Sequence, residues 1–479
     1  MSDESKRQRL SGPDNAWLRL GERTNQMVIT GVLVFDEPIE FEALREKFVN
    51  NLLPFERFRQ RVVYDALGRP KWELDPEFEL ESHLHHVALP EPQDKETFEQ
   101  FVAGQMATQL HPDMPLWQAY LVEGAGDGNA LVMRIHHSLG DGFAMIYLAM
   151  GLADNPSEID LPIGSIPDPP DVGDAPDVGD PPDVGTADDA PAATAADGGA
   201  SSQSLSERLG GVRERGRTAV SAAKSVKRGV SMGVQAPGNL YDLLTMPDEP
   251  DTSLVGDLGV PKRVAWTDPI DLDLVRELGE AYGGTINDVL MTVTAGGFRR
   301  YLEAVGELDR AEDLRVAVPV NLKPLEQRTE DLGNYFGLVY LQLPVGRSDP
   351  RDRMSTVKAR MDELKGSPDA FLTYALLYLG GNLPEPIQDV IAQRLRDKST
   401  AVVTNVPGPK EAFTFAGKEV SDIFFWVPQS QGIGIGLSIL SYDGSVRVGV
   451  ASDAKLVSDP QRLADCLQAE VDALADGLE

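Results

Sequence analysis

The hydrophobic positions of the first 150 residues follow strand and helix patterns in turn. Between residues 26 and 65 they predict a strand, a helix and a second strand: QMVITGVLVF, FEALREKFVNNL and RFRQRVVYD. A helical pattern follows over 98–110, and two apolar runs, LWQAYLVEG and ALVMRIHH, then flank the turn sequence AGDGN as in a hairpin. After an Asp-Gly pair, another helix is predicted from apolar residues at helical spacing: Phe143, Ile146, Tyr147 and Met150. This region is therefore α/β with mixed strand order.

The regular patterns stop after about residue 161 and resume near residue 260. In between, PDVG occurs three times, starting at Pro170, Pro176 and Pro182. A segment this rich in Pro, Gly and Asp cannot bury enough apolar surface to offset the entropy of ordering, so we expect disorder. Beyond it the pattern predicts helices over 272–282 and 286–305 and five strands: LRVAVPVNL, YFGLVYLQLPV, STAVVTNVPG, IGIGLSILSY and SVRVGVASD.

The length of the chain indicates more than one domain. A chain of 479 residues exceeds what a single hydrophobic core usually supports. We predict an α/β fold of two similar mixed-sheet domains, over residues 1–165 and 256–479. A long, partly disordered linker over 166–255 joins them; it is first acidic and rich in Pro and Gly, and then basic.

Charge and composition narrow the class of protein. The 76 acidic and 44 basic residues give a net charge of −32, which disfavours nucleic acid as a partner because its phosphates would be repelled. Such acidity, with arginine much commoner than lysine, is typical of a halophilic protein; the alternative is an acidic mesophilic protein whose linker inflates the charge. With no run of about eighteen apolar residues and no signal-peptide stretch, we expect a cytoplasmic protein. The single cysteine, Cys466, excludes an intramolecular disulfide and is expected to be a packing residue.

The stretch RIHHSLGDG, residues 134–142, holds the candidate chemistry. It ends an apolar strand, so an imidazole there, whose pKa suits proton transfer near neutral pH, can reach a cleft from a rigid backbone. Asp141 can cap the following helix, and we expect Gly140 and Gly142 to provide close approach and unusual backbone angles. The alternative is two packed histidines, as at 85–86, where no Asp-Gly follows. The added Asp-Gly favours a functional pair.

No credible nucleophile accompanies these histidines. GxSxG occurs once, at 229–233, inside the basic part of the linker, whereas a nucleophile elbow needs a buried strand before the serine and a helix after it. The glycines of GIGIGLS are spaced for a strand with a bare face and not for dinucleotide binding. We therefore expect a base that acts directly on the substrate, without a covalent intermediate, a metal or another cofactor.

Several motifs follow one another in a recognisable order. HHxxxDG occupies 136–142, and with it occur SGPDNAWL near the start, PLW at 115–117, ND at 287–288, GN at 333–334, NVPGP at 405–409 and LSYDG around 441. With these motifs the chain resembles the bacterial-type wax ester synthase/diacylglycerol acyltransferase family. That family is a branch of the fold shared by chloramphenicol acetyltransferase and peptide-synthetase condensation domains. HHxxxDG is diagnostic of the superfamily, and PLW, ND and NVPGP together narrow it to the family.

The resemblance implies an O-acyltransferase that moves a fatty acyl group from acyl-CoA to a long-chain alcohol or diacylglycerol. By analogy, His137 is the general base, while His136 and Asp141 hold the loop and the imidazole. PLW is expected to be core. The substrate-binding positions that we expect are Gly142, from its place in the loop, and Asn287, Asp288 and Asn405, from the family motifs. The alternative for Asn287 and Asn405 is that they only tie down backbone.

The partners and the rival functions complete the prediction. We expect acyl-CoA and a lipid alcohol or diacylglycerol as substrates. The basic segment 205–234 has the pattern of an amphipathic basic helix, which suits either an anionic membrane or lipid-droplet surface, hence a peripheral place on the inner membrane face, or the protein's own acidic surface. The rivals are a condensation-type acyltransferase using a carrier-protein thioester and a non-catalytic lipid-droplet protein.

Overall fold

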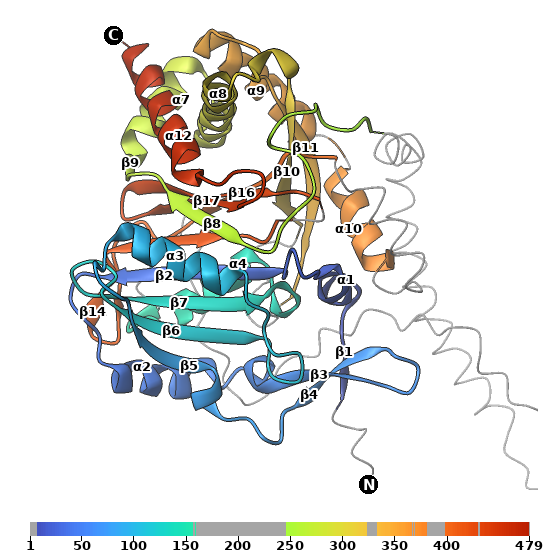
Figure 1. The fold of residues 1–479 in the computed structure, drawn as a ribbon, viewed down its shortest axis with the longest axis vertical. Helices are drawn as coiled ribbons and strands as arrows, with labels where there is room; N and C mark the ends of the chain where they lie inside the picture. Colours follow the sequence, from blue (N-terminus) through green and yellow to red (C-terminus); the bar gives the residue numbers. More distant parts are fainter. Residues whose placement is uncertain are drawn as a thin grey trace, which may run out of the picture. The chain divides into compact units, whose positions relative to one another are not determined.

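The computed structural model of this chain describes residues 7–156, 159, 246–322, 333–365, 367, 369–380, 398–429 and 432–478 (Figure 1). These residues, from both halves of the chain, belong to one compact unit. The PDVG repeats, the GxSxG sequence and the basic segment 205–234 lie outside the described residues, as do the predictions made for them. The domain boundaries at 165 and 256 stay predictions.

The first sheet leads into the HHxxxDG loop. In the described residues its strand order is β15-β2-β7-β6-β5, and only β5 and β6 run parallel. Its strands are β2 (Val28–Phe35), β5 (Leu84–Ala88), β6 (Trp117–Glu123), β7 (Asn129–His136) and β15 (Asp422–Trp426). Strand β2 is apolar on both faces because helices cover both. Phe98 of α3 (Lys95–Met106) packs in one cluster with Val32, and Leu148 of α4 (Gly142–Gly151) packs in another with Leu33.

Strand β15 comes from the second half of the chain but completes the sheet of the first half. It pairs antiparallel with β2, with Asp422 opposite Val34 and Trp426 opposite Thr30. The hairpin before it, β13 (Thr414–Phe415) and β14 (Lys418–Glu419), is held by a carboxylate of the first half. Asp154 accepts hydrogen bonds from the backbone N–H groups of Ala416 and Gly417, at 3.1 and 2.8 Å. The two halves are therefore joined by shared sheet and shared core.

The second sheet has the order β11-β10-β12-β16-β17-β8 in the described residues, and β9 also pairs with β17. Its strands are β8 (Lys262–Trp266), β9 (Ile270–Asp271), β10 (Leu314–Asn321), β11 (Phe336–Leu343), β12 (Ala401–Pro407), β16 (Ile435–Tyr442) and β17 (Ser445–Asp453). Four helices lie over this sheet in Figure 1: α7 (Leu272–Tyr282), α8 (Ile286–Val305), α9 (Pro350–Lys365) and α12 (Pro460–Asp476). Their apolar residues share a core with those of the sheet. The two mixed sheets confirm the predicted α/β fold class, and α7 and α8 have the predicted bounds.

A small sheet and a short helix complete the described first half of the chain. The sheet has the order β1-β4-β3, from β1 (Gln8–Arg9), β3 (Gln60–Tyr64) and β4 (Pro70–Leu74). Helix α1 (Gly12–Leu20) follows β1 and contacts both the loop and α10 (Asp369–Gly380) of the second half. Helix α2 (Phe41–Lys47) follows β2. None of the helices described in this chain is long and apolar enough to cross a membrane.

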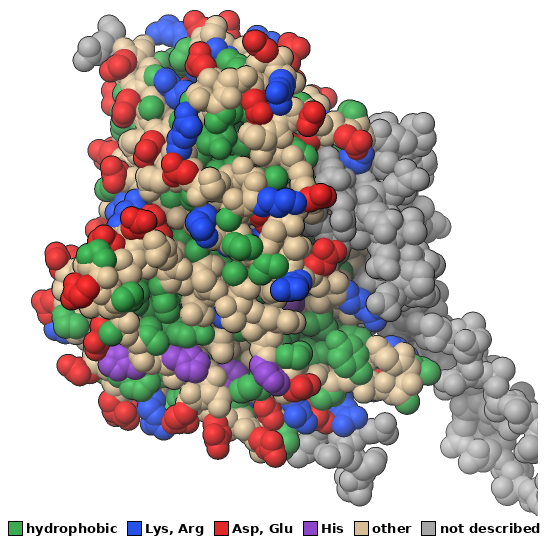
Figure 2. Space-filling model, viewed as in Figure 1, with side chains coloured by type: hydrophobic (Ala, Val, Ile, Leu, Met, Phe, Trp, Pro, Cys, Tyr) green, Lys and Arg blue, Asp and Glu red, His purple; other side chains and the backbone are tan. Residues whose placement is uncertain are grey.

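The acidity of the chain is not confined to the predicted linker. Residues 166–255 contain 15 acidic and 7 basic residues, a net charge of −8, so −24 of the total of −32 belongs to the two flanking regions. On the face shown in Figure 2, acidic side chains are spread over both halves and do not gather in one patch. The linker therefore does not account for most of the charge.

Candidate active site

The HHxxxDG loop is held by backbone hydrogen bonds at its first two residues. The N–H groups of His136 and His137 donate to the carbonyl oxygens of Leu116 and Met27, at 3.0 and 2.7 Å. The loop then makes a single 3₁₀ turn over His137–Leu139 before α4 begins. These contacts fix the backbone of both histidines to neighbouring segments, as the strand-end position predicted.

Asp141 caps α4 and also ties the loop to the second half of the chain. Its Oδ1 accepts the N–H of Ala144 at 3.0 Å, and its Oδ2 accepts the N–H of Tyr335 at 3.1 Å. The predicted cap is thus confirmed. The same carboxylate holds together two segments that are far apart in the sequence.

The expectation of unusual backbone angles in this loop was wrong. Neither Gly140 nor Gly142 adopts the left-handed backbone region that favours glycine; Gly140 has a φ of 173°, which is extended backbone. Gly140 lies in a tight space instead: a Cβ there would be 2.9 Å from Met145 Cε and 3.1 Å from Ala144 Cβ, so a larger residue would have to displace the Met145 side chain. Gly142 is the first residue of α4 and lines a pocket.

His137 is buried and enclosed by groups from both halves. The Trp17 indole of α1 stacks on its imidazole with ring centres 4.5 Å apart, and Phe336 of β11 lies 5.5 Å away. Its Nδ1 hydrogen-bonds to Asn334 Oδ1 at 2.8 Å, whereas no described residue hydrogen-bonds to its Nε2. Burial lowers the pKa of His137 below its usual value, and the negative charge of Asp141 opposes that shift. The ring is therefore neutral near pH 7 and able to accept a proton.

His136 has the character of a structural residue. Its Nδ1 accepts the backbone N–H of Ser138 at 3.1 Å and lies 2.9 Å from the Ser138 hydroxyl, both inside the loop. Burial, and to a smaller extent the neighbouring His137, lower the pKa of His136 to about 3. Its contacts agree with the predicted role of holding the loop.

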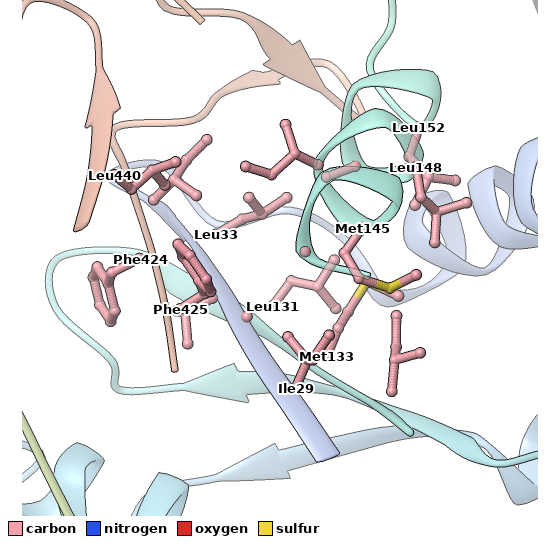
Figure 3. A pocket seen from close by; sticks show the side chains of 17 residues that line it. Ile29, Leu33, Leu131, Met133, Met145, Leu148, Leu152, Phe424, Phe425 and Leu440 are labelled. Carbon is pink, nitrogen blue, oxygen red and sulfur yellow. The ribbon is translucent and has the colours of Figure 1, made fainter. Parts of the chain in front are cut away.

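An apolar pocket begins at this loop and extends under α4 (Figure 3). Ile135, two residues before His137, and Gly142, directly after Asp141, are part of its wall. It contains about 680 Å³ of space between atoms, including a part open to solvent. All the side chains that line it are apolar, and most come from β2, β7, β15 and α4: Ile29, Leu33, Leu131, Met133, Met145, Leu148, Leu152, Ile423, Phe424 and Phe425. Such a wall suits a hydrocarbon chain and offers nothing to a charged ligand.

The family to which the chain belongs follows from comparison with family models. The model described as the wax ester synthase/diacylglycerol acyltransferase catalytic domain matches residues 10–290, more than half of the chain. The WS/DGAT C-terminal domain model matches residues 332–475. The chain belongs to the wax ester synthase/diacylglycerol acyltransferase family. It is accordingly an acyltransferase.

Individual relatives agree with this assignment. A Mycobacterium tuberculosis protein named as a probable diacylglycerol O-acyltransferase is 26% identical over 452 residues, covering 92% of this chain and 90% of its own. The fold is similar to that of the wax ester synthase/diacylglycerol acyltransferase of Marinobacter aquaeolei VT8, with a TM-score of 0.64 and 21% identity over 98% of each chain. A starter condensation domain of rhizomide synthetase, solved in complex with C8-CoA, has a TM-score of 0.56 at 13% identity, over 98% of this chain and 95% of its own.

The structure brings together two of the asparagines that the family motifs marked. Asn405 Nδ2 at the end of β12 donates to Asn287 Oδ1 in the first turn of α8. Asp288 is fully buried and completes a capping box, its Oδ2 accepting the N–H and the hydroxyl of Thr285 at 2.8 and 2.9 Å. These contacts are structural, and the substrate-binding role of Gly142, Asn287, Asp288 and Asn405 stays a prediction.

Two residues predicted to be packing residues are confirmed as such. Trp117 of the PLW motif is completely buried, and its indole N–H donates to the carbonyl oxygen of Phe58 at 2.8 Å. Cys466 of α12 is partly buried against the core of the second half, and burial raises the pKa of its thiol. Within the described residues, no group of three or more His, Cys, Asp or Glu side chains is placed to hold a metal ion.

Three residues of the site were not singled out by sequence analysis: Asp14, Trp17 and Asn334. Trp17 covers one face of the His137 ring, and Asn334 links that ring to the buried carboxylate of Asp14, which accepts from Asn334 Nδ2 at 2.8 Å. The sequence signal was present, because these residues lie in the SGPDNAWL and GN motifs. No local pattern, however, pairs residues that are more than 300 positions apart.

Proposed function

We propose that this acyltransferase moves a fatty acyl group from acyl-CoA to the hydroxyl of a long-chain alcohol or of diacylglycerol, with His137 as the general base. The observation that carries the proposal is a buried, neutral imidazole whose Nε2 is hydrogen-bonded to no described residue, in a segment whose Ile135 and Gly142 line an apolar pocket. The pocket suits the acyl chain. The relative's name, diacylglycerol O-acyltransferase, supports the acceptor class.

The proposed reaction is a single direct transfer. His137 Nε2 takes the proton of the acceptor hydroxyl as its oxygen attacks the thioester carbonyl carbon. The C–O bond of the ester forms, the C–S bond breaks, and the leaving thiolate of CoA receives the proton from the imidazolium. No described cysteine suits a covalent step, because Cys466 is a packing residue of α12. Mass spectrometry after mixing with acyl-CoA alone should show no acylated protein, and a stoichiometric adduct that is chased by alcohol would contradict the direct transfer.

The deciding experiment compares two histidine variants. With palmitoyl-CoA and either hexadecanol or diolein, His137→Ala should lower thiol release about 10²- to 10⁴-fold, the usual loss for a general base. The matched control is His86→Ala, because His86 belongs to the other histidine pair of the chain, at 85–86. His86 lies on β5 and contacts Glu123 of the neighbouring strand β6, away from the loop. The control should keep its activity. Retention of more than a tenth of activity by a folded His137→Ala variant would exclude the proposed base.

We also infer that the enzyme works at a membrane or lipid-droplet surface, because its acceptors and products dissolve only in lipid. The basic segment 205–234 is the predicted anchor, and its alternative partner is the protein's own acidic surface. Flotation of the full chain with anionic liposomes, beside a variant lacking 205–234, tests this. If the full chain floats and the variant does not, segment 205–234 is supported as the anchor. If both proteins float equally, or neither floats, that segment is excluded as the anchor.

A further inference from the structure

Asn334 makes three hydrogen bonds that join the two halves of the chain around the catalytic histidine. Its Nδ2 lies 2.8 Å from Asp14 Oδ1 and 2.8 Å from the backbone carbonyl oxygen of His137. Its Oδ1 lies 2.8 Å from His137 Nδ1. Both Asn334 and Asp14 are buried, with exposed fractions of 3% and 5%. Water therefore does not compete for these bonds.

The identity of the partners determines which way the Asn334 amide faces. A backbone carbonyl oxygen can only accept, so the atom of Asn334 next to it must be the donating nitrogen. The amide oxygen then faces His137 Nδ1, and because an amide oxygen can only accept, Nδ1 must carry the proton. We infer that Asn334 is a positioning residue that holds His137 in the tautomer protonated on Nδ1, and that Asp14 holds the Asn334 amide in the orientation this requires.

The catalytic consequence rests on the proposed function of His137. With Nδ1 protonated, the lone pair of the neutral ring is on Nε2, the nitrogen that no described residue occupies. In the opposite tautomer Nε2 would carry a proton and could not accept another. In serine proteases the residue behind the histidine has the corresponding role, and a change that favours the wrong tautomer there costs about 10⁴-fold in kcat. In this protein the neutral amide of Asn334 occupies the corresponding position, and the carboxylate of Asp14 binds that amide.

Helix α1 gives Asp14 a fixed place relative to the imidazole. Ser11 caps the helix by accepting the N–H of Asp14 at 3.2 Å. One turn later, Trp17 on the same helix stacks on His137, with an angle of 18° between the two rings. The helix therefore fixes the face of the imidazole through Trp17, and its Nδ1 edge through Asp14 and Asn334. A structural role alone would not require the amide to present its oxygen to the ring.

The tautomer is measured directly by NMR on protein labelled with ¹⁵N in the histidine rings, with His137→Ala assigning the signal. The full-length wild type should show His137 protonated on Nδ1 and not on Nε2. Asn334→Leu should lose that preference and lower kcat about 10²- to 10⁴-fold, with KM for acyl-CoA changed less than threefold. Asn51→Leu is the matched control, because among the described residues the side chain of this asparagine hydrogen-bonds to the carbonyl oxygen of Gly151, at the far end of α4 from the loop.

A pair of variants at Asp14 tests the second part of the inference. Asp14→Asn still offers an oxygen to Asn334 Nδ2 and should keep both the tautomer and most of kcat, whereas Asp14→Leu should lose both. A wild-type ring protonated on Nε2 would overturn the inference without any variant, even if Asn334→Leu fails to fold. An unchanged tautomer in folded Asn334→Leu would overturn it too. Full activity in His137→Ala would instead refute the proposed function and leave the tautomer assignment standing.

Discussion

Replacing Gly31 by valine should shorten the acyl chain that the enzyme accepts. Gly31 lies on β2 in the floor of the apolar pocket, between Met133 of β7 and Phe425 of β15, which are its partners across the strands. A Cβ at Gly31 would meet no atom within 4 Å, so the side chain would extend into empty space. Because the position is the middle of a strand, a β-branched residue suits its backbone.

The size of the effect follows from the carbon atoms added. Valine brings three carbons into the pocket and displaces roughly three methylene groups of a bound chain. At about 0.8 kcal/mol for each buried methylene, the loss is about 2.4 kcal/mol, or about 60-fold in kcat/KM for a long-chain acyl-CoA. Alanine, which brings one carbon, should cost about 4-fold by the same reasoning. A chain too short to reach Gly31 should be used as well as before.

The assay measures kcat/KM by thiol release for acyl-CoA substrates of increasing chain length, with one fixed acceptor. The wild type, Gly31→Ala and Gly31→Val should form a graded series that diverges only for long chains. Gly104→Ala serves as the control, because this glycine of α3 is exposed and also has no neighbour within 4 Å of a Cβ. An equal loss for short and long chains would refute the reasoning. A second series uses one short acyl-CoA and alcohols of increasing chain length; a loss confined to that series would assign the pocket to the acceptor instead.

Three further predictions concern the histidines and the surface charge. His136→Ala should lower the free energy of unfolding at pH 7.5 by about 3 kcal/mol through a cavity and lost hydrogen bonds. Because burial lowers the pKa of His136 from 6.5 to about 3, only the unfolded chain takes up a proton there as the pH falls below 6.5. In urea titrations the wild type should therefore lose about 2 kcal/mol more than His136→Ala between pH 7.5 and 5.0, and parallel losses would contradict this. Burial also lowers the pKa of His137, so its neutral form persists below pH 6.5. The acidic limb of the pH profile of kcat/KM should therefore lie below pH 6.5. A limb at pH 7 or above would exclude His137 as the titrating base. The melting temperature should rise between low salt and molar potassium chloride, in the full chain and in a variant lacking 168–196, because salt screens the repulsion of a net charge of −32; a flat or falling value would exclude the halophilic reading.

Much of the fold could be predicted because its strands and helices have strong local patterns. Helices α7 and α8 match their predicted bounds, and β10 and β17 follow apolar runs that flanking polar residues delimit. The strand β15, in contrast, was not predicted. Its sequence, DIFFW, is a short apolar run whose partner β2 lies almost 400 residues earlier, and hydrophobic periodicity contains no information on such pairing. Its place in the first sheet depends on tertiary packing alone.

The site, too, has residues that the sequence could predict and residues that it could not. HHxxxDG could be interpreted from the sequence because a strand end, a helix cap and two histidines occur within seven residues. The backbone angle expected at Gly140 was wrong, because its backbone is extended and what is close to it is the packed side chain of Met145. Asn334 could not be assigned a role from the sequence, since its hydrogen bonds are to three atoms of Asp14 and His137, which are distant in the sequence.

The contacts that cross between the halves imply that neither half contains a working site. His137 belongs to the first half, but the amide on its Nδ1 and the N–H that binds Asp141 Oδ2 come from Asn334 and Tyr335 of the second. The apolar pocket is also lined by β15, so the second half contributes to the wall of the pocket as well as to the surroundings of His137. The environment of the proposed general base and the apolar pocket therefore form together, when the two halves pack.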